Sequence, residues 1–74
     1  MEVEVRLFAT FGEGREKKQK IKINENTTIL DIINILNIDE NEVAIMLLNG
    51  RDGNSDRMLN DGDVISIFPP VGGG

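Results

Sequence analysis

The sequence predicts an α+β domain in which one main helix packs on one face of a mixed sheet of four or five strands. Two observations predict this class. Apolar and polar residues alternate near the start of the chain and again over 64–68, which is the period of a strand with one buried face. Between them, residues 29–36 carry apolar side chains at helical spacing. A helix and a sheet that each have one apolar face are expected to pack against each other.

Residues 2–23 predict a hairpin. A strand over 2–8 has an apolar face formed by every second residue and places Phe8 on the opposite, polar face. A turn over 10–15 contains two glycines, and a second strand over 18–23 points its lysines toward water. Charge on an edge strand also discourages pairing with other chains.

The helix is predicted to begin after Thr28, a good N-cap residue, and Asp31 in its first turn suits the positive end of the helix dipole. Asn37 is a plausible left-handed residue at the C-terminal end. The predicted buried face carries Ile29, Ile32, Ile33 and Leu36, and is widened by Leu30 and Ile35.

An acidic connector over 38–42 precedes a continuous apolar run at 43–48, which is typical of a central strand. The register of this strand stays open. If Met46 and Leu48 point to the core, Leu47 lies on the outer face.

Turns are predicted at Asn49-Gly50 and at 61–63. The stretch between them, 51–60, is irregular with a short strand, and Leu59 is expected in the core. The last strand covers 64–68 with its isoleucines inward. A β-grasp arrangement satisfies this order of elements, and in that fold the last strand runs parallel to the first in the centre of the sheet.

Composition excludes several kinds of function. The formal net charge is −5, which argues against nucleic-acid binding. The chain has no Cys and no His, so the commonest nucleophile, general base and metal ligands are missing. No apolar run approaches the roughly 20 residues that span a bilayer. We therefore expect no metal site, no membrane partner and, because zero Cys suits a reducing compartment, a cytoplasmic protein.

Charged residues are unevenly placed along the chain. Five of the eight basic residues lie within 15–22, and this basic run is either a solvated strand face or a docking surface. The carboxylates of Glu40, Asp61 and Asp63 carry no metal-ligand spacing, so turn and solubility roles are expected for them.

The C-terminal segment is the most distinctive part of the sequence. Pro69 and Pro70 stop sheet pairing after Phe68, and three glycines follow. We predict a domain over 1–68 and a flexible Gly-Gly tail over 69–74. An idle, disordered end is the alternative, whereas a phosphate-binding loop is a poor fit because no helix follows the glycines.

Four segments together resemble a known family. They are Val5-Arg6-Leu7-Phe8-Ala9, Leu48-Asn49-Gly50-Arg51, Asp61-Gly62-Asp63 and Ile67-Phe68-Pro69-Pro70-Val71-Gly72-Gly73-Gly74. The chain resembles the ubiquitin-like sulfur carriers, above all the small subunit of molybdopterin synthase, and also the archaeal ubiquitin-like modifiers. One departure is Gly72, where the family commonly has another small residue before its two glycines.

The resemblance implies a carrier without catalytic side chains or a bound cofactor of its own. An E1-like adenylating enzyme would use ATP to activate the carboxylate of Gly74, with Gly73 and Gly72 completing the tail motif. A sulfur donor protein would then form a thiocarboxylate, and the molybdopterin synthase large subunit would receive the tail. Glycines suit a tail that threads a narrow channel, because they have no Cβ.

Strand parity places Phe8, Leu47 and Phe68 on the face away from the helix. With Pro69, Pro70 and Val71 they form the predicted partner-binding surface, although single exposed aromatic residues are also ordinary. Three hypotheses remain: a sulfur carrier for molybdopterin, a modifier joined to lysines through Gly74, and a β-grasp interaction module with an inert tail.

Overall fold

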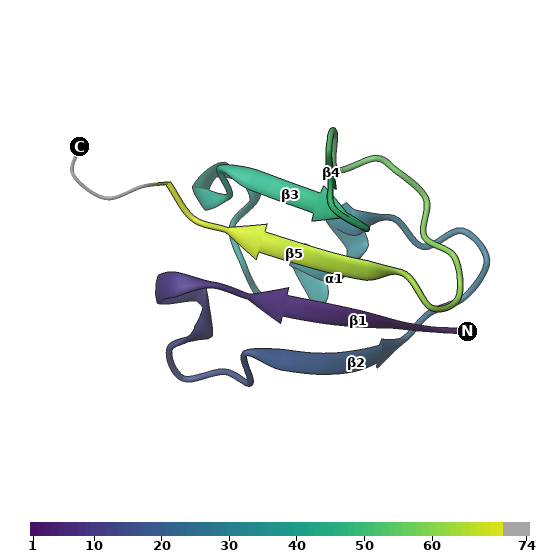
Figure 1. Cartoon of the computed structure of the whole chain (residues 1–74), viewed down its shortest axis with the longest axis horizontal. Coiled ribbons are helices and arrows are strands. Elements are labelled where there is room, and N and C mark those ends of the chain that lie inside the picture. Colours follow the sequence, from purple (N-terminus) through teal and green to yellow (C-terminus); the bar gives the residue numbers. More distant parts are fainter. Residues whose placement is uncertain (71–74) are drawn as a thin grey trace.

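The computed structural model describes residues 1–70. Five strands form one mixed sheet in the order β2-β1-β5-β3-β4. The strands are β1 Glu2–Leu7, β2 Lys18–Lys22, β3 Ile45–Leu48, β4 Arg51–Asp52 and β5 Val64–Phe68. β5 lies parallel to β1, and the other neighbouring pairs are antiparallel. In Figure 1 the viewer looks onto the sheet, with the arrows of β1 and β5 pointing the same way and the helix behind them.

The helix α1, Ile29–Ile35, begins as the sequence predicts. Thr28 and Asp31 form a capping box, in which each side chain accepts a hydrogen bond from the other residue's backbone N–H. Asn37 has a φ of 57° and occupies the predicted left-handed position after the helix. The prediction was wrong for Ile35, which is 59% exposed, because the short helix turns only Ile29, Ile32 and Ile33 fully onto the sheet.

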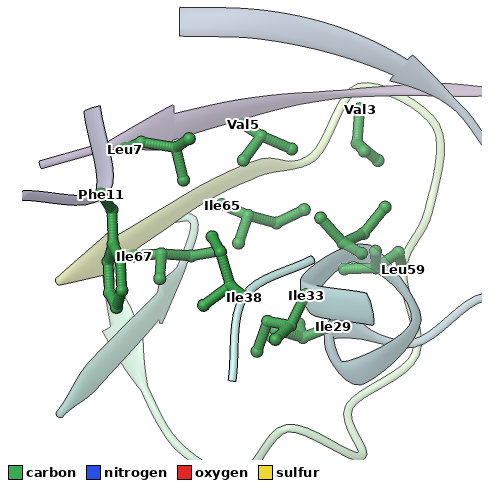
Figure 2. Close-up of a cluster of buried hydrophobic side chains, with 11 residues drawn as sticks. Val3, Val5, Leu7, Phe11, Ile29, Ile33, Ile38, Leu59, Ile65 and Ile67 are labelled. Atoms are coloured by element: carbon green, nitrogen blue, oxygen red, sulfur yellow. The ribbon is translucent and has the colours of Figure 1, made fainter. Parts of the chain in front are cut away.

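The core lies between α1 and one face of the sheet. Figure 2 shows Val5, Ile65 and Ile67 of the sheet pointing toward Ile29 and Ile33 of the helix. All the apolar residues predicted inward on β1 and β5 are buried, as is Leu59. The complete buried cluster is Val3, Val5, Leu7, Phe11, Ile29, Ile32, Ile33, Ile38, Leu59, Ile65 and Ile67.

The segment predicted as a simple turn over 10–15 contains a short 3-10 helix, η1 Ala9–Gly12. It carries Phe11 into the core, where this side chain is 5% exposed. A second 3-10 helix, η2 Glu40–Glu42, forms the acidic connector, and Ile38 before it is buried. Both buried side chains come from segments whose polar and glycine content predicts only loops.

The open register of the third strand is resolved by its pairing with β5. Met46 lies opposite Ile67, and both Met46 and Leu48 pack against the core, so Leu47 lies on the outer face. The strand begins at Ile45 rather than 43. Asn49 and Gly50 both have positive φ, 52° and 85°, which is the backbone of the predicted two-residue hairpin turn.

The arrangement is the β-grasp fold that the sequence predicts, with its helix on one face and the other face uncovered within residues 1–70. β5 ends at Phe68, while the division into a domain over 1–68 and a tail over 69–74 stays a prediction. No helix in the described part of the chain is long and apolar enough to cross a membrane.

Candidate functional site

The site is built where the carboxyl ends of β1 and β5 meet. Leu7 lies opposite Ile67 in the parallel pair, and both side chains point into the core. The residues that follow them, Phe8 directly after β1 and Phe68 at the end of β5, therefore point to the outer face. Their rings stack with centroids 4.3 Å apart and planes inclined by 13°. Figure 1 shows that the chain leaves the sheet at this same end.

A third strand extends this stack into a patch. Ile45, at the beginning of β3, lies directly opposite Phe68, and Leu47 follows two residues later on the same face. Phe8 is 39% exposed and Ile45 42% exposed, whereas Leu47 and Phe68 are half-buried. We call Phe8, Ile45, Leu47 and Phe68 the apolar patch.

Three of these four residues are in the predicted partner-binding surface, and the structure brings those three together. Ile45 is missed by the sequence reasoning. The signal was present, because Ile45 and Leu47 share strand parity, but it became usable only once the register of β3 was known. Exposed apolar patches are characteristic of protein-binding surfaces, and the partner-binding role of this patch stays a prediction.

The chain leaves the sheet directly beside the patch. The last carbonyl of β5, that of Phe68, accepts a hydrogen bond from the Ala44 N–H at 2.9 Å. Pro69 is half-buried and Pro70 is exposed, and neither has an N–H to continue the ladder. The remaining predicted site residues, Val71, Gly72, Gly73 and Gly74, lie outside the described residues.

A strained turn supports the other side of the stack. Ala9 has a φ of 52°, in the left-handed region that costs an L-residue roughly 1–2 kcal/mol. After this turn the chain carries Phe11 into the core, as Figure 2 shows, whereas Phe8 stays 39% exposed. The Phe8 N–H still donates to the Ile67 carbonyl at 3.2 Å, which ties the turn to β5.

Beyond the patch, the outer face is charged. Arg6 Nε donates to Glu4 Oε2 at 2.6 Å. This bond from the Arg6 guanidinium holds the pKa of Glu4 below its ordinary value of 4.5, and the charges of Lys18 and Lys20 on the neighbouring strand act in the same direction. The exposed lysines of the basic run lie on β2 and in the turn before it, and Lys17 and Lys18 line a hollow together with Phe8 of the apolar patch.

The carboxylates that could have indicated a metal site hold turns together. Asp61 Oδ1 accepts from the Glu2 N–H at 2.8 Å, and Asp63 Oδ2 accepts from the Asn60 N–H at 2.7 Å. Asp63 Oδ1 also accepts from the Asn49 side-chain amide at 2.9 Å. Across residues 1–70, no three acidic, His or Cys side chains are grouped so that they could hold a metal ion.

A β-grasp sheet whose central strand runs straight into the C-terminal segment is the architecture of ubiquitin-like proteins. The sequence model of the ThiS family matches residues 5–74. The chain therefore belongs to the ThiS family, the ubiquitin-like sulfur carriers, whose members act as carriers without catalysis of their own.

Individual relatives are named either as archaeal modifier proteins or as subunits of a molybdopterin-converting factor. Over the full length of both chains, the protein is 36% identical to small archaeal modifier protein 3 of Haloferax volcanii. It is likewise 36% identical, with complete coverage of both chains and a TM-score of 0.66, to a chain in the complex of subunits 1 and 2 of the molybdopterin-converting factor of Helicobacter pylori. The crystal structure of the modifier protein SAMP1 of Haloferax volcanii, 21% identical with full coverage and a TM-score of 0.80, shows the same fold.

Proposed function

We propose that this protein is a sulfur carrier that acts as the small subunit of a molybdopterin synthase. The observation that carries the proposal is the apolar patch at the point where the C-terminal segment leaves the sheet. A carrier must deliver its terminal carboxylate into another protein's active site, and a docking surface at the root of the tail fixes where that carboxylate goes. The Helicobacter pylori relative is found in complex with a second subunit, which supports this use of the surface.

The chemistry takes place at Gly74. An oxygen of its carboxylate attacks the α-phosphorus of ATP in an E1-like enzyme, which forms an acyl-adenylate and releases pyrophosphate. The outer sulfur of a donor-protein persulfide then attacks the acyl carbon and AMP leaves, which gives an acyl disulfide. A thiol of the activating system cleaves the S–S bond of this acyl disulfide, is itself oxidised to a disulfide with the donor thiol, and releases the thiocarboxylate. The large subunit would use this sulfur for the pterin precursor.

The domain contributes binding and positioning to this chemistry. Activation happens in the partner, so the carrier needs no general base, in agreement with a sequence that has no His and no Cys. Two prolines at the root of the tail reduce the conformational freedom that docking removes. Stacked rings are likewise rigid contact area that loses little entropy on binding.

The test is an intact-mass measurement. The protein is incubated with the E1-like enzyme of its own source, ATP and a sulfur donor, and replacement of one carboxylate oxygen by sulfur is expected. A chain lacking Gly73 and Gly74 is the control: it has no Gly-Gly terminus and should not gain sulfur, and its urea unfolding should be unchanged because the sheet ends at Phe68. An unchanged mass in the wild-type protein would contradict the proposal.

A second function is favoured by one observation, the 36% identity to small archaeal modifier protein 3 over the whole chain. In this role Gly74 would form an isopeptide bond with a lysine of a target protein. Mass spectrometry of proteins from the source cell would detect these conjugates, and a sulfur carrier alone would give none. An inert tail, the third possibility, requires that removal of the last two glycines leaves every partner interaction intact.

A further inference from the structure

One cross-strand pair on the outer face places two positive charges directly opposite each other. Arg6 of β1 lies opposite Lys18 of β2. Further along the same ladder the pairs are complementary, with Glu4 opposite Lys20 and Glu2 opposite Lys22. Opposite charges in directly facing positions stabilise a sheet and like charges destabilise it. The Arg6–Lys18 pair is therefore a local conflict in an otherwise matched ladder.

This pair borders a hollow beside the apolar patch. The Phe8 hollow, as we call it, has a volume of about 390 Å³ and a mostly apolar lining; it is lined by Arg6, Leu7, Phe8, Ala9, Lys17 and Lys18. One side of the Phe8 ring thus stacks on Phe68 within the patch, while Phe8 also lines a depression with two facing cations at its edge. The hollow and the patch are continuous through this one side chain.

The nearby carboxylate of Glu4 does not neutralise both cations. It accepts a hydrogen bond from Arg6 Nε, and its pKa is lowered chiefly by this bond and further by Lys18 and Lys20. Lys18 has no ion pair within residues 1–70, and the two terminal nitrogens of Arg6 donate no hydrogen bond to this part of the chain. Donors and positive charge therefore remain at the edge of the hollow.

We propose that the Phe8 hollow binds an acidic segment of the partner protein, with an Asp or Glu carboxylate between Arg6 and Lys18 and a neighbouring apolar side chain against Phe8. A guanidinium and an ammonium that face each other supply charge-assisted donors for one carboxylate. The apolar lining suits a protein side chain, and the adjacent Glu4 carboxylate would repel a phosphate dianion about twice as strongly as a singly charged carboxylate. This inference rests on the proposed function only for the identity of the partner.

The proposal predicts that stability and binding respond separately. Lys18→Gln removes the repulsion from Arg6 together with the attraction to Glu4, so the stability of the free protein should change little, yet the complex becomes weaker. Lys22→Gln is the matched control on the same strand, because Lys22 faces Glu2 and lies outside the hollow. Its substitution removes a favourable pair, so the free protein becomes slightly less stable while binding stays the same.

The first experiment measures affinity and association rate for the large subunit and for the E1-like enzyme, at low and at moderate salt. Lys18→Glu is expected to weaken binding roughly tenfold, mostly through a slower association that loses its salt dependence. Lys22→Glu should stay within about twofold. Equal losses from the two reversals would overturn the proposal, because they would show only a general charge effect.

The second experiment does not depend on knowing the partner. A photo-crosslinking amino acid replaces Lys17, which lines the hollow and leaves Arg6 and Lys18 in place, or Lys22 as the control, in the source cell, and the crosslinked peptides are sequenced. A peptide with an Asp or Glu beside an apolar residue, captured at position 17 and not at 22, supports the proposal. If that peptide belongs to some other protein, the inference stands and the proposed function falls. No crosslink at position 17, or a peptide without an acidic residue, overturns the inference.

A third measurement excludes a free anion as the ligand. Inorganic phosphate and ATP are titrated separately into the isolated protein while the amide resonances of Phe8 and Lys18 are followed by NMR. No saturable shift is expected below millimolar concentrations. Saturable binding of either anion at the hollow would overturn the assignment to a protein carboxylate.

Discussion

The stacked rings of Phe8 and Phe68 provide a test that separates a docking surface from a part of the core. The perturbation is a double-mutant cycle of Phe8→Ala, Phe68→Ala and the combined variant. Replacing a fully buried Phe by Ala costs about 3–5 kcal/mol of stability. Phe8 is 39% exposed and Phe68 is half-buried, so each single substitution should lower the free energy of unfolding by only about 1–2 kcal/mol.

The cycle also gives the energy of the stack itself. Rings 4.3 Å apart and nearly parallel are expected to couple by about 0.5–1.5 kcal/mol beyond the area they bury. If the rings are anchors for a partner, the same substitutions should weaken binding by about 2 kcal/mol or more, roughly thirtyfold in Kd. The loss in binding should therefore exceed the loss in stability.

Two measurements check this. Urea unfolding is followed by far-ultraviolet circular dichroism, because the chain has no Trp or Tyr to report by fluorescence. Binding to the large subunit is measured by calorimetry. Phe11→Leu is the control, since Phe11 is 5% exposed and part of the core, and it should lose stability with unchanged affinity. Stability losses above about 3 kcal/mol at Phe8 and Phe68 with unchanged affinity would refute the assignment of the patch as a docking surface.

Four further predictions concern the frame around the site. Ala9→Gly should raise the free energy of unfolding by roughly 0.5–1 kcal/mol, measured in urea, because glycine tolerates the φ of 52°; a lower stability would show that the turn is not strained. Asn49→Ala should lower it by about 2–3 kcal/mol, because the side chain accepts from the Val64 N–H, donates to Asp63 and holds a positive φ; Asn49→Gly, which keeps only the backbone conformation, should lose less. Arg57→Lys should lower the free energy of unfolding by about 1–3 kcal/mol, because the guanidinium donates to the backbone carbonyls of Met46, Arg51 and Asn54, which one ammonium cannot satisfy together. An unchanged free energy of unfolding would mean that these three hydrogen bonds do not stabilise the loop. Arg6→Gln should return the pKa of Glu4 part of the way toward 4.5 in an NMR titration. Because that pKa is lowered in the folded state, the Arg6–Glu4 contribution to stability is present above pH 4.5 and is lost as the pH falls through the lowered value. The free energies of unfolding of wild type and variant should therefore converge in acid.

Much of the fold could be predicted because local rules and the global fold agree. Alternation alone assigned the inner residues of β1 and β5, and the capping residue Thr28 located the start of the helix correctly against its β-branched composition. The turn at Asn49-Gly50 followed from residues that tolerate positive φ. Each of these signals lies within a few residues of the element it specifies.

The rest depended on contacts between distant segments. Nothing near 43–48 chooses the inward face of β3; the pairing with β5 and the hydrogen bonds of Asn49 to Val64 and Asp63 fix it. Phe11 could not be assigned to the core because its burial follows from the reversal at Ala9, a conformation that alanine seldom adopts. The Phe8 hollow was equally hidden, since facing cations become visible only once strand register pairs Arg6 with Lys18.

Core residues and residues of the candidate site alternate along the same strand, β1. On β1 the odd-numbered residues up to Leu7 fill the core, while Glu4, Arg6 and then Phe8 form the outer face. A slip of one residue would expose the core set and bury the charged set, so a register that preserves the fold also places Phe8 next to Phe68 and Arg6 opposite Lys18. The outer face can therefore vary residue by residue to suit a partner, because those side chains contribute little to the core. Within one ThiS-family fold, the partner should accordingly be decided by the outer-facing residues of β1, β2 and β3, and exchanging these residues between family members should exchange partners without unfolding the domain.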